Sequence, residues 1–152
     1  MNDEVMLTRA KRTDGKGWTR GYYARLTDSS KGKVSHRIYT GYAESEADGG
    51  EHTFYPDWYE VDPATLCKST GLRDAEGELV YQGDIVNYPI QQGGFRGKEL
   101  HEVVFEQRGG SAYFGIKMDH LETWSFGMEV PTKLMKVVGN IYDDPKLIGG
   151  GT

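Results

Sequence analysis

The sequence is poor in cysteine, in aliphatic residues and in long apolar runs. Cys67 is the single cysteine among 152 residues, which excludes a disulfide within the chain and gives no reason to expect an oxidising compartment. No apolar run approaches the roughly 18 residues that a membrane-spanning helix needs. No charged segment followed by an apolar one opens the chain. We therefore expect a cytoplasmic protein that does not enter a membrane.

Residues that can form a hydrophobic core are few. Leu, Ile, Val and Phe together number 30, and the apolar share of the chain is 37%. Ten Tyr and three Trp restore part of the buriable surface, so we expect a thin core rich in aromatic residues. The 21 Gly residues favour many turns over long helices. A chain of this length buries roughly 68–70% of its unfolded surface, so it needs no metal or disulfide to fold.

Charge is distributed unevenly along the chain. The formal net charge is −5, which does not by itself indicate nucleic-acid binding. Residues 8–37 nevertheless contain nine Lys and Arg against two Asp, whereas residues 44–62 contain seven Asp and Glu and no Lys or Arg. The acidic segment could neutralise the basic one within the molecule or in a neighbouring copy.

Residues 18–40 predict an antiparallel β-hairpin. The first strand places Trp18 and Tyr22 on one face and Tyr23 and Arg25 on the other. A polar turn follows, and alternating apolar and polar residues then predict a returning strand. The cationic residues are expected mainly on the outer face of this hairpin and in its turn.

A short helix is predicted after an acidic, glycine-containing loop at residues 43–51. Asp62 suits an N-cap, Pro63 suits the first helical turn and Gly71 suits the stop. A helix of about two turns fits this segment, with Leu66 facing inward.

The second half of the chain shows regular turn chemistry. Residues 74–77 read Asp-Ala-Glu-Gly, which is typical of a type I turn that leads into a glycine bulge. A Gly-Asp turn then precedes an apolar strand, and further short strands are predicted over residues 102–106 and 112–118. We assign structural roles in turns and strands to Gly71, Asp74, Gly77, Gly83, Asp84, Gly139 and Asn140.

Two separated segments are the most distinctive in the chain. Residues 70–86 read TGLRDAEGELVYQGDIV, and residues 138–147 read VGNIYDDPKL. Their order and spacing resemble the YopX family of phage and prophage proteins. That family carries a Thr-Gly-Leu-x-Asp turn, then Gly-Asp-Ile-Val, and ends in Gly-Asn-Ile before a Pro-Leu stop. The resemblance is strong over residues 59–147 and looser over residues 17–42.

The resemblance implies a phage or prophage origin and an α+β fold that is predominantly β. The expected fold has short antiparallel strands, a small barrel-like C-terminal part and one or two short helices. Residues 1–152 are expected to form a single YopX-like domain. Within it, residues 1–58 hold the hairpin and the acidic loop, and residues 59–147 form the core module. The resemblance implies no chemistry, because the family brings no established activity.

Signatures of catalysis and metal binding are weak. His36, His52, His101 and His120 show no His-x-x-x-His spacing, and Cys67 has no Cys-x-x-Cys companion. Neither a Gly-x-Ser-x-Gly elbow nor a phosphate-binding loop that ends in Lys-Ser or Lys-Thr is present. We therefore predict a protein that is not an enzyme and needs no cofactor or metal.

The basic hairpin is the best functional lead. Lys and Arg interleaved with Trp and Tyr could follow a phosphate backbone while the aromatic rings stack on bases. The candidate nucleic-acid-binding residues are Arg20, Arg25, Lys31, Lys33 and Arg37. The alternative, which the sequence favours, is a solvated face whose charges keep the sheet edge soluble.

A second set of aromatic residues could form either a binding surface or part of the core. Its members are Tyr55, Trp58, Tyr59, Tyr113 and Trp124. We expect a phage or prophage accessory protein of unknown biochemical role. It should act as a non-catalytic binding module that forms a homo-oligomer and contacts phage or host protein or nucleic acid. The alternative function is a nucleic-acid-binding small β-barrel protein that uses the basic hairpin.

Overall fold

The structure is a computed structural model that describes residues 3–46, 52–89, 91–92, 95–96, 99–118, 122–126 and 129–149. The chain divides into two compact units. The N-terminal unit is Met6–Lys68, and the C-terminal unit is Ser69–Thr152 together with Met1–Val5. Both units consist mainly of antiparallel strands, and the helical segments described are 3-10 turns of three or four residues.

The N-terminal unit is an antiparallel sheet with the strand order β4-β3-β2-β1. Its strands are β1 (Thr8–Lys11), β2 (Trp18–Asp28), β3 (Lys33–Glu46) and β4 (His52–Glu60). Cys67 and Lys68, which begin the strand β5 (Cys67–Arg73), pair with β1 on the side away from β2. The hairpin of β2 and β3 confirms the alternation that the sequence predicts at residues 18–40.

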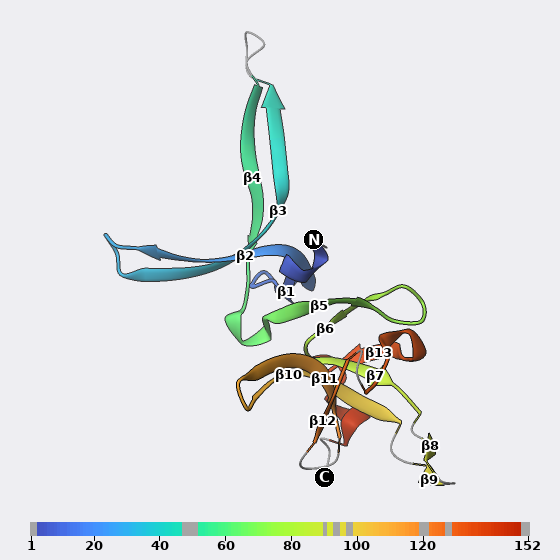
Figure 1. Ribbon diagram of the computed structural model, residues 1–152. Helices are drawn as coiled ribbons and strands as arrows, with labels where there is room; N and C mark the ends of the chain where they lie inside the picture. The colour runs from blue at the N-terminus through green and yellow to red at the C-terminus, as the bar shows by residue number, and fades with distance from the viewer. Residues whose placement is uncertain are drawn as a thin grey trace. The chain divides into compact units, whose positions relative to one another are not determined.

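The long strand β3 belongs to two hairpins. Its first half pairs with β2, and its second half continues alongside β4 to the pair Glu46 and His52. Figure 1 shows the two hairpins pointing in different directions from the place where they share β3. The register of β3 against β4 shifts between Tyr39 and Gly41, so Thr40 has no partner residue on β4. This is the arrangement of a β-bulge, which bends a strand and redirects its side chains.

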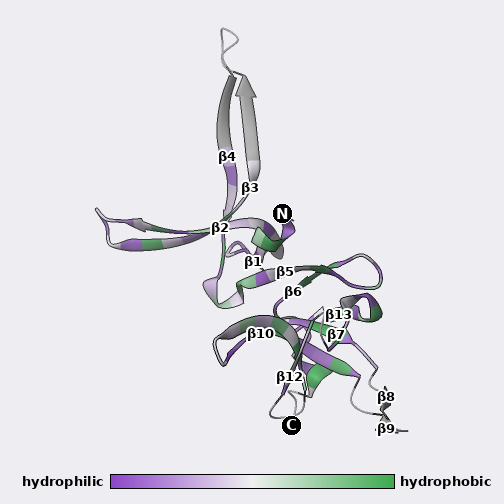
Figure 2. Ribbon diagram, in the orientation of Figure 1, coloured by the Kyte–Doolittle hydropathy of each residue, from purple (hydrophilic) through white to green (hydrophobic). Residues whose placement is uncertain are grey.

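One face of the N-terminal sheet covers a small core. Ala10, Ile38 and Val61 are buried there, and Tyr23 and Leu66 pack against them. Gly21 lies among these strands so closely that a Cβ atom in its place would sit 2.2 Å from the carbonyl oxygen of Tyr39. Figure 2 shows hydrophilic and apolar residues mixed along the β2–β3 hairpin, as expected for a sheet that buries one face and exposes the other.

The C-terminal unit contains a five-stranded antiparallel sheet with the order β12-β11-β10-β7-β13. These strands are β7 (Asp84–Asn87), β10 (Leu100–Arg108), β11 (Ser111–Lys117), β12 (Thr123–Ser125) and β13 (Lys136–Asn140). The remainder of β5 pairs with β6 (Leu79–Tyr81), and β8 (Gln91–Gln92) pairs with β9 (Phe95–Arg96). Four 3-10 turns are described. In chain order they are η1 (Asp3–Met6), η2 (Pro63–Thr65), η3 (Thr132–Leu134) and η4 (Pro145–Ile148), and η2 lies in the N-terminal unit.

The core of the C-terminal unit is aliphatic. It consists of Val80, Val86, Val103, Ile116, Val130 and Met135. Tyr88, Trp124 and Phe126 are only partly buried where they pack against it. The expectation of an aromatic-rich core is therefore wrong, because valines and isoleucines fill most of the fully enclosed positions, and most of the aromatic side chains whose burial the structure describes are partly exposed.

Two further expectations about the fold are wrong. The predicted two-turn helix is only the 3-10 turn η2, with Asp62 as its N-cap and Leu66 already in extended conformation. From Cys67 the residues alternate between buried and exposed, as in a strand, and they form β5 in place of further helical turns. Gly71 therefore lies within that strand and does not end a helix. The barrel-like C-terminal part is also not found, since the described strands form an open sheet with β12 and β13 at its edges.

Candidate nucleic-acid interface

The residues that resemble the family motifs hold the C-terminal unit together. One carboxylate oxygen of Asp74 accepts hydrogen bonds from the N–H groups of Glu76 and Glu78, and the N–H of Gly77 closes the turn onto the Asp74 carbonyl. Gly77 ends the predicted turn with φ +85°, a backbone conformation that glycine adopts without strain.

The second motif lies beside the first in the sheet. Strand β13 pairs with β7, with Gly139 opposite Ile85 and Asn140 opposite Asp84. The carboxylate of Asp84 is 1% exposed and accepts a hydrogen bond from the N–H of Tyr81 at 2.7 Å. The Ile141 N–H donates to the carbonyl of Gly83 at 2.9 Å. These contacts are within the protein, so they position strands and leave no open site at the motifs.

Two of the side chains considered for catalysis, Cys67 and His36, make hydrogen bonds within the protein, whereas His101 is buried and its Nε2 has no hydrogen-bond partner in the described ranges. Cys67 is buried, and its thiol donates to the carbonyl oxygen of Thr65 at 3.3 Å. The Tyr23 hydroxyl and Nδ1 of His36 are hydrogen-bonded at 2.7 Å. Among the residues that the structure describes, no group of three or more His, Cys, Asp and Glu is placed to hold a metal ion. His120 and the side chain of His52 lie outside the described part.

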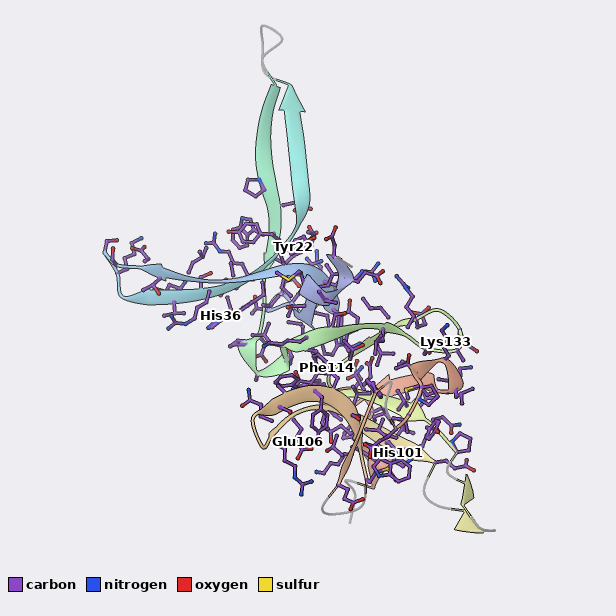
Figure 3. The ribbon with its side chains drawn as sticks, in the orientation of Figure 1. Tyr22, His36, His101, Glu106, Phe114 and Lys133 are labelled. Carbon is purple, nitrogen blue, oxygen red and sulfur yellow. The ribbon has the colours of Figure 1, made fainter. Side chains whose placement is uncertain are left out.

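One face of the N-terminal sheet gathers aromatic and basic side chains. Residues that stand opposite each other in neighbouring strands share a face of the sheet. By this pairing, the face away from the core carries Arg9, Lys11, Trp18, Arg20, Tyr22, Arg37, Tyr39 and Trp58. We refer to these eight residues as the aromatic–basic face. Figure 3 places Tyr22, a member of this face, on the opposite side of the ribbon from His36.

A row of aromatic rings crosses three strands of this face. Tyr22 on β2 stands opposite Tyr39 on β3, which stands opposite Trp58 on β4. Tyr22 is 54% exposed and Trp58 is 38% exposed, so both rings present surface to solvent. Neighbouring strands lie about 4.8 Å apart, so the row offers successive rings on which planar groups can stack.

Cationic groups lie over the tryptophan rings of the face. The guanidinium carbon of Arg37 is 3.7 Å from the ring centroid of Trp58, and that of Arg9 is 5.0 Å from the centroid of Trp18. The Nζ atom of Lys11 is 5.6 Å from the same Trp18 centroid. Such cation–π contacts hold each cationic side chain at the face, and the Nε–H of Arg37 also donates to Oγ of Ser35 at 3.1 Å. A cation held in this way can still attract a phosphate group.

The structure separates the five candidate cations of the basic hairpin. Arg20, Arg37 and Lys33 lie on the aromatic–basic side of the sheet, with Lys33 opposite Asp28 near the turn. Arg25 lies on the other side, opposite His36, and Lys31 is in the turn itself.

The candidate residues chosen from the hairpin sequence do not include two cations of the face. Arg9 and Lys11 come from β1, and they join the face because β1 pairs with β2 in the register that sets Arg9 opposite Arg20 and Lys11 opposite Trp18. The alternation of Thr8, Arg9, Ala10 and Lys11 is the sequence signal that indicates them.

The second aromatic set is split by the structure. Trp58 belongs to the aromatic–basic face, whereas the ring of Tyr59 lies 3.7 Å from the guanidinium of Arg12. Tyr113 and Trp124 line a hollow of about 610 Å³ in the C-terminal unit, together with Arg108. The side chain of Tyr55 lies outside the described part.

Comparisons with known proteins identify a family and a fold. The sequence model of the family described as YopX protein matches residues 14–149. Among curated proteins, none matches the chain. The crystal structure of protein EF1440 from Enterococcus faecalis resembles this chain with a TM-score of 0.51 and 19% sequence identity, over 94% of this chain and 96% of that one. At that identity the likeness shows a shared fold only.

Proposed function

This chain belongs to the YopX family, and from this premise we propose that it is a non-catalytic binding protein whose aromatic–basic face binds single-stranded nucleic acid. The resemblance to phage and prophage proteins supports a role as an accessory protein that a phage or prophage encodes and that acts in the host cytoplasm. None of the helical segments in the described ranges has the length and apolarity that crossing a membrane requires.

The observation that carries the proposal is the row of Tyr22, Tyr39 and Trp58 across neighbouring strands, with a guanidinium on the last ring. Stacking of a base on an aromatic ring is worth about 1–3 kcal/mol, and it needs a base whose face is not already covered by a neighbour. Single strands offer such bases, whereas a duplex keeps its bases stacked. The face therefore favours a single strand over a duplex.

The charges around the face support an anionic ligand. Residues 8–37, which provide most of the face, contain nine Lys and Arg against two Asp. Glu60 stands opposite Arg37 at the edge of the face and offsets part of this charge. Binding should therefore weaken as salt concentration rises, because each phosphate contact releases counterions.

A non-catalytic role is supported by how the reactive side chains are used. The thiol of Cys67, the imidazole of His36 and the carboxylates of Asp74 and Asp84 are all held in contacts within the protein. A general base or nucleophile needs a side chain within reach of a substrate.

Fluorescence anisotropy with a labelled single strand of about 12 mixed nucleotides tests the proposal. We expect saturable binding at about 50 mM salt that weakens strongly toward about 200 mM, and weaker binding of the matched duplex. Arg20→Glu should reduce the affinity more than Arg25→Glu, because the two substitutions make the same change of charge in the same strand on opposite faces.

Two results would refute the proposal. The first is no binding of the single strand at low salt. The second is equal loss with Arg20→Glu and Arg25→Glu, which would indicate a general charge effect and no role for the face. In either case the Tyr, Trp and Arg residues of the face would fit a protein partner instead.

A further inference from the structure

We propose that the bulge of β3 forms a pocket for one guanine base of the bound strand, with Tyr22 and Tyr39 as the stacking rings and Asp57 as the acceptor that selects guanine. This inference rests on the proposed function and names the base that the face recognises.

The pocket lies where the two hairpins of the N-terminal unit part from each other. A hollow of about 440 Å³ is lined by Tyr22, Tyr23, Ala24, Tyr39, Thr40, Gly41 and Pro56. Its volume falls within the range of about 300–1,000 Å³ that small-molecule sites occupy. Figure 3 shows Tyr22 close to the point at which β3 and β4 leave the β2 strand. Two residues that line the hollow, Tyr22 and Tyr39, belong to the aromatic row of the aromatic–basic face, so the hollow lies beside that row.

The walls of the hollow suit a flat aromatic ligand. Tyr22 and Tyr39 come from opposite positions of paired strands, so their side chains stand next to each other on the same face. Tyr22 is more than half exposed, which leaves its ring surface available for a stacked base. The other walls include Ala24, Gly41 and Pro56, which add apolar surface and no charge.

A polar pair beside the hollow can distinguish bases: Thr40 lines the hollow, and Asp57, which stands opposite Gly41, is hydrogen-bonded to Thr40. The hydroxyl of Thr40, the residue left without a partner in the bulge, donates to Oδ2 of Asp57 at 3.2 Å. Asp57 is exposed, so its remaining acceptor positions can receive further hydrogen bonds. Because an ionised carboxylate only accepts, it favours a base edge that presents donors.

Guanine matches this acceptor better than the other bases do. Its N1–H and N2–H₂ groups point in the same direction and can meet the two oxygens of one carboxylate. Adenine and cytosine present one amino group at the corresponding edge, and thymine presents one N–H between two carbonyl oxygens. A carboxylate beside these carbonyls is repelled, so thymine is the least favoured base.

The neighbouring charges direct the phosphates away from Asp57. Arg20 and Arg37 lie two positions from Tyr22 and Tyr39 along their strands, and adjacent residues of one face lie two positions apart. A strand whose base enters the hollow can therefore place its backbone along these arginines, with the base edge turned toward the carboxylate of Asp57.

Competition anisotropy with a series of strands of about 12 thymines tests the proposal. One central thymine is replaced by guanine, adenine, cytosine or hypoxanthine, which lacks the N2 amino group. We expect the guanine strand to bind about tenfold more tightly than the all-thymine strand. The hypoxanthine strand should lose most of that gain.

Asp57→Asn provides the test on the protein. Its side chain has the same shape and is exposed, so the fold should be retained, and a thermal unfolding curve checks this. The variant should abolish the preference for guanine, and its affinity for the all-thymine strand should not fall, because the repulsion between the carboxylate and the thymine carbonyl oxygens is removed. Tyr22→Phe should keep the preference, because the ring remains, whereas Tyr22→Ala should lose it.

The outcomes separate the pocket from the function on which it rests. Equal affinity for all five strands, or a preference for guanine that survives Asp57→Asn, would refute the pocket while leaving single-strand binding in place. Absence of binding to every strand would refute the proposed function itself.

Discussion

The carboxylate of Asp74 accepts a hydrogen bond at 2.9 Å from the main-chain N–H of Val137, although the two residues are 63 positions apart. The other carboxylate oxygen closes the local turn through Glu76 and Glu78. Asp74 is 5% exposed, so one enclosed side chain joins the turn after β5 to the strand β13. This contact ties the turn motif to the residue that directly precedes the C-terminal motif.

Replacing Asp74 by Ala should destabilise the C-terminal unit by about 3 kcal/mol. The substitution leaves main-chain N–H groups without acceptors, and hydrogen bonds to a charged group contribute about 1.5–3 kcal/mol each. The free energy of unfolding in urea measures the loss. Glu76→Ala is the matched control, because it removes only the exposed ion pair of Glu76 with Lys136 and should cost less than about 1 kcal/mol. Equal losses for the two variants would contradict this role of Asp74.

Stability should fall in acid partly through the same carboxylate. Burial acts to raise the pKa of Asp74, but the N–H groups of Val137, Glu78, Glu76 and Gly77 outweigh it and hold the pKa below its ordinary value. A lowered pKa in the folded state contributes stability above the pKa of the unfolded chain, about 3.9, and that stability is lost as pH falls through the folded-state pKa.

Asp74→Asn isolates this acid effect. The amide keeps one acceptor oxygen and does not titrate, so the variant should be less stable than the parent at pH 7 and lose less stability between about pH 5 and pH 2. Unfolding in urea across this pH range measures both quantities. Asp14 and Asp28 also have lowered pKa values, through the side chains of Arg12 and Ser30, but both are exposed and should contribute little. A parallel fall in both proteins would show that Asp74 is not responsible.

Patterns of neighbouring residues predicted much of this structure. They failed where the conformation depends on pairing with a strand that is distant in the sequence. The alternation of Tyr22 with Tyr23 and the Asp74 turn depend on neighbouring residues, and both are found as predicted. The prediction of a helix after Asp62 was wrong. Pairing of Cys67 and Lys68 with β1 outweighs the capping residues, so the helical conformation stops after one 3-10 turn.

The candidate site was only partly predictable for the same reason. A run of basic residues indicates an anionic ligand, but the side of the sheet on which each cation lies depends on the pairing register. That register separates Arg25 from Arg20 and adds Arg9 from a different strand. The bulge at Thr40, which shapes the hollow, has one local signal, because Gly41 follows directly and a glycine within a strand is typical of a bulge, but the two partners of β3 depend on pairing with distant strands.

Gly21→Ala should destabilise the N-terminal unit by about 3 kcal/mol. The added Cβ would lie 2.2 Å from the carbonyl oxygen of Tyr39 and 3.0 Å from Cγ2 of Ile38, so β2 and β3 would have to move apart. Thermal or urea unfolding measures the change. Thr27→Ala at an exposed position of the same strand is the control and should cost less than about 1 kcal/mol. An unchanged midpoint for Gly21→Ala would contradict the close approach of the two strands.

The homo-oligomer that the sequence analysis predicts is checked by light scattering at micromolar concentration. The exposed aromatic rings of Tyr22 and Trp58 provide contact area that a second copy could bury. We expect a species larger than the 17.0 kDa single chain. A homogeneous species of single-chain mass would contradict the prediction. Addition of a saturating oligonucleotide distinguishes an oligomer held by the aromatic–basic face, which should dissociate, from one held elsewhere.

The contributions of Arg37 and Trp58 to nucleic-acid affinity should differ in their dependence on salt concentration. Arg37→Gln removes one phosphate contact, so the slope of log affinity against log salt concentration should decrease by about 0.7 for a single strand. Trp58→Ala removes a stacking ring and should lower affinity about tenfold at every salt concentration. Because the tryptophan also holds the guanidinium at 3.7 Å, Trp58→Phe should keep most of the affinity, whereas Trp58→Leu should not. Arg25→Gln is the control for charge, since Arg25 lies on the opposite face and should leave the slope unchanged. A slope that falls equally for Arg37→Gln and Arg25→Gln would show that the ligand responds to net charge and does not contact the aromatic–basic face.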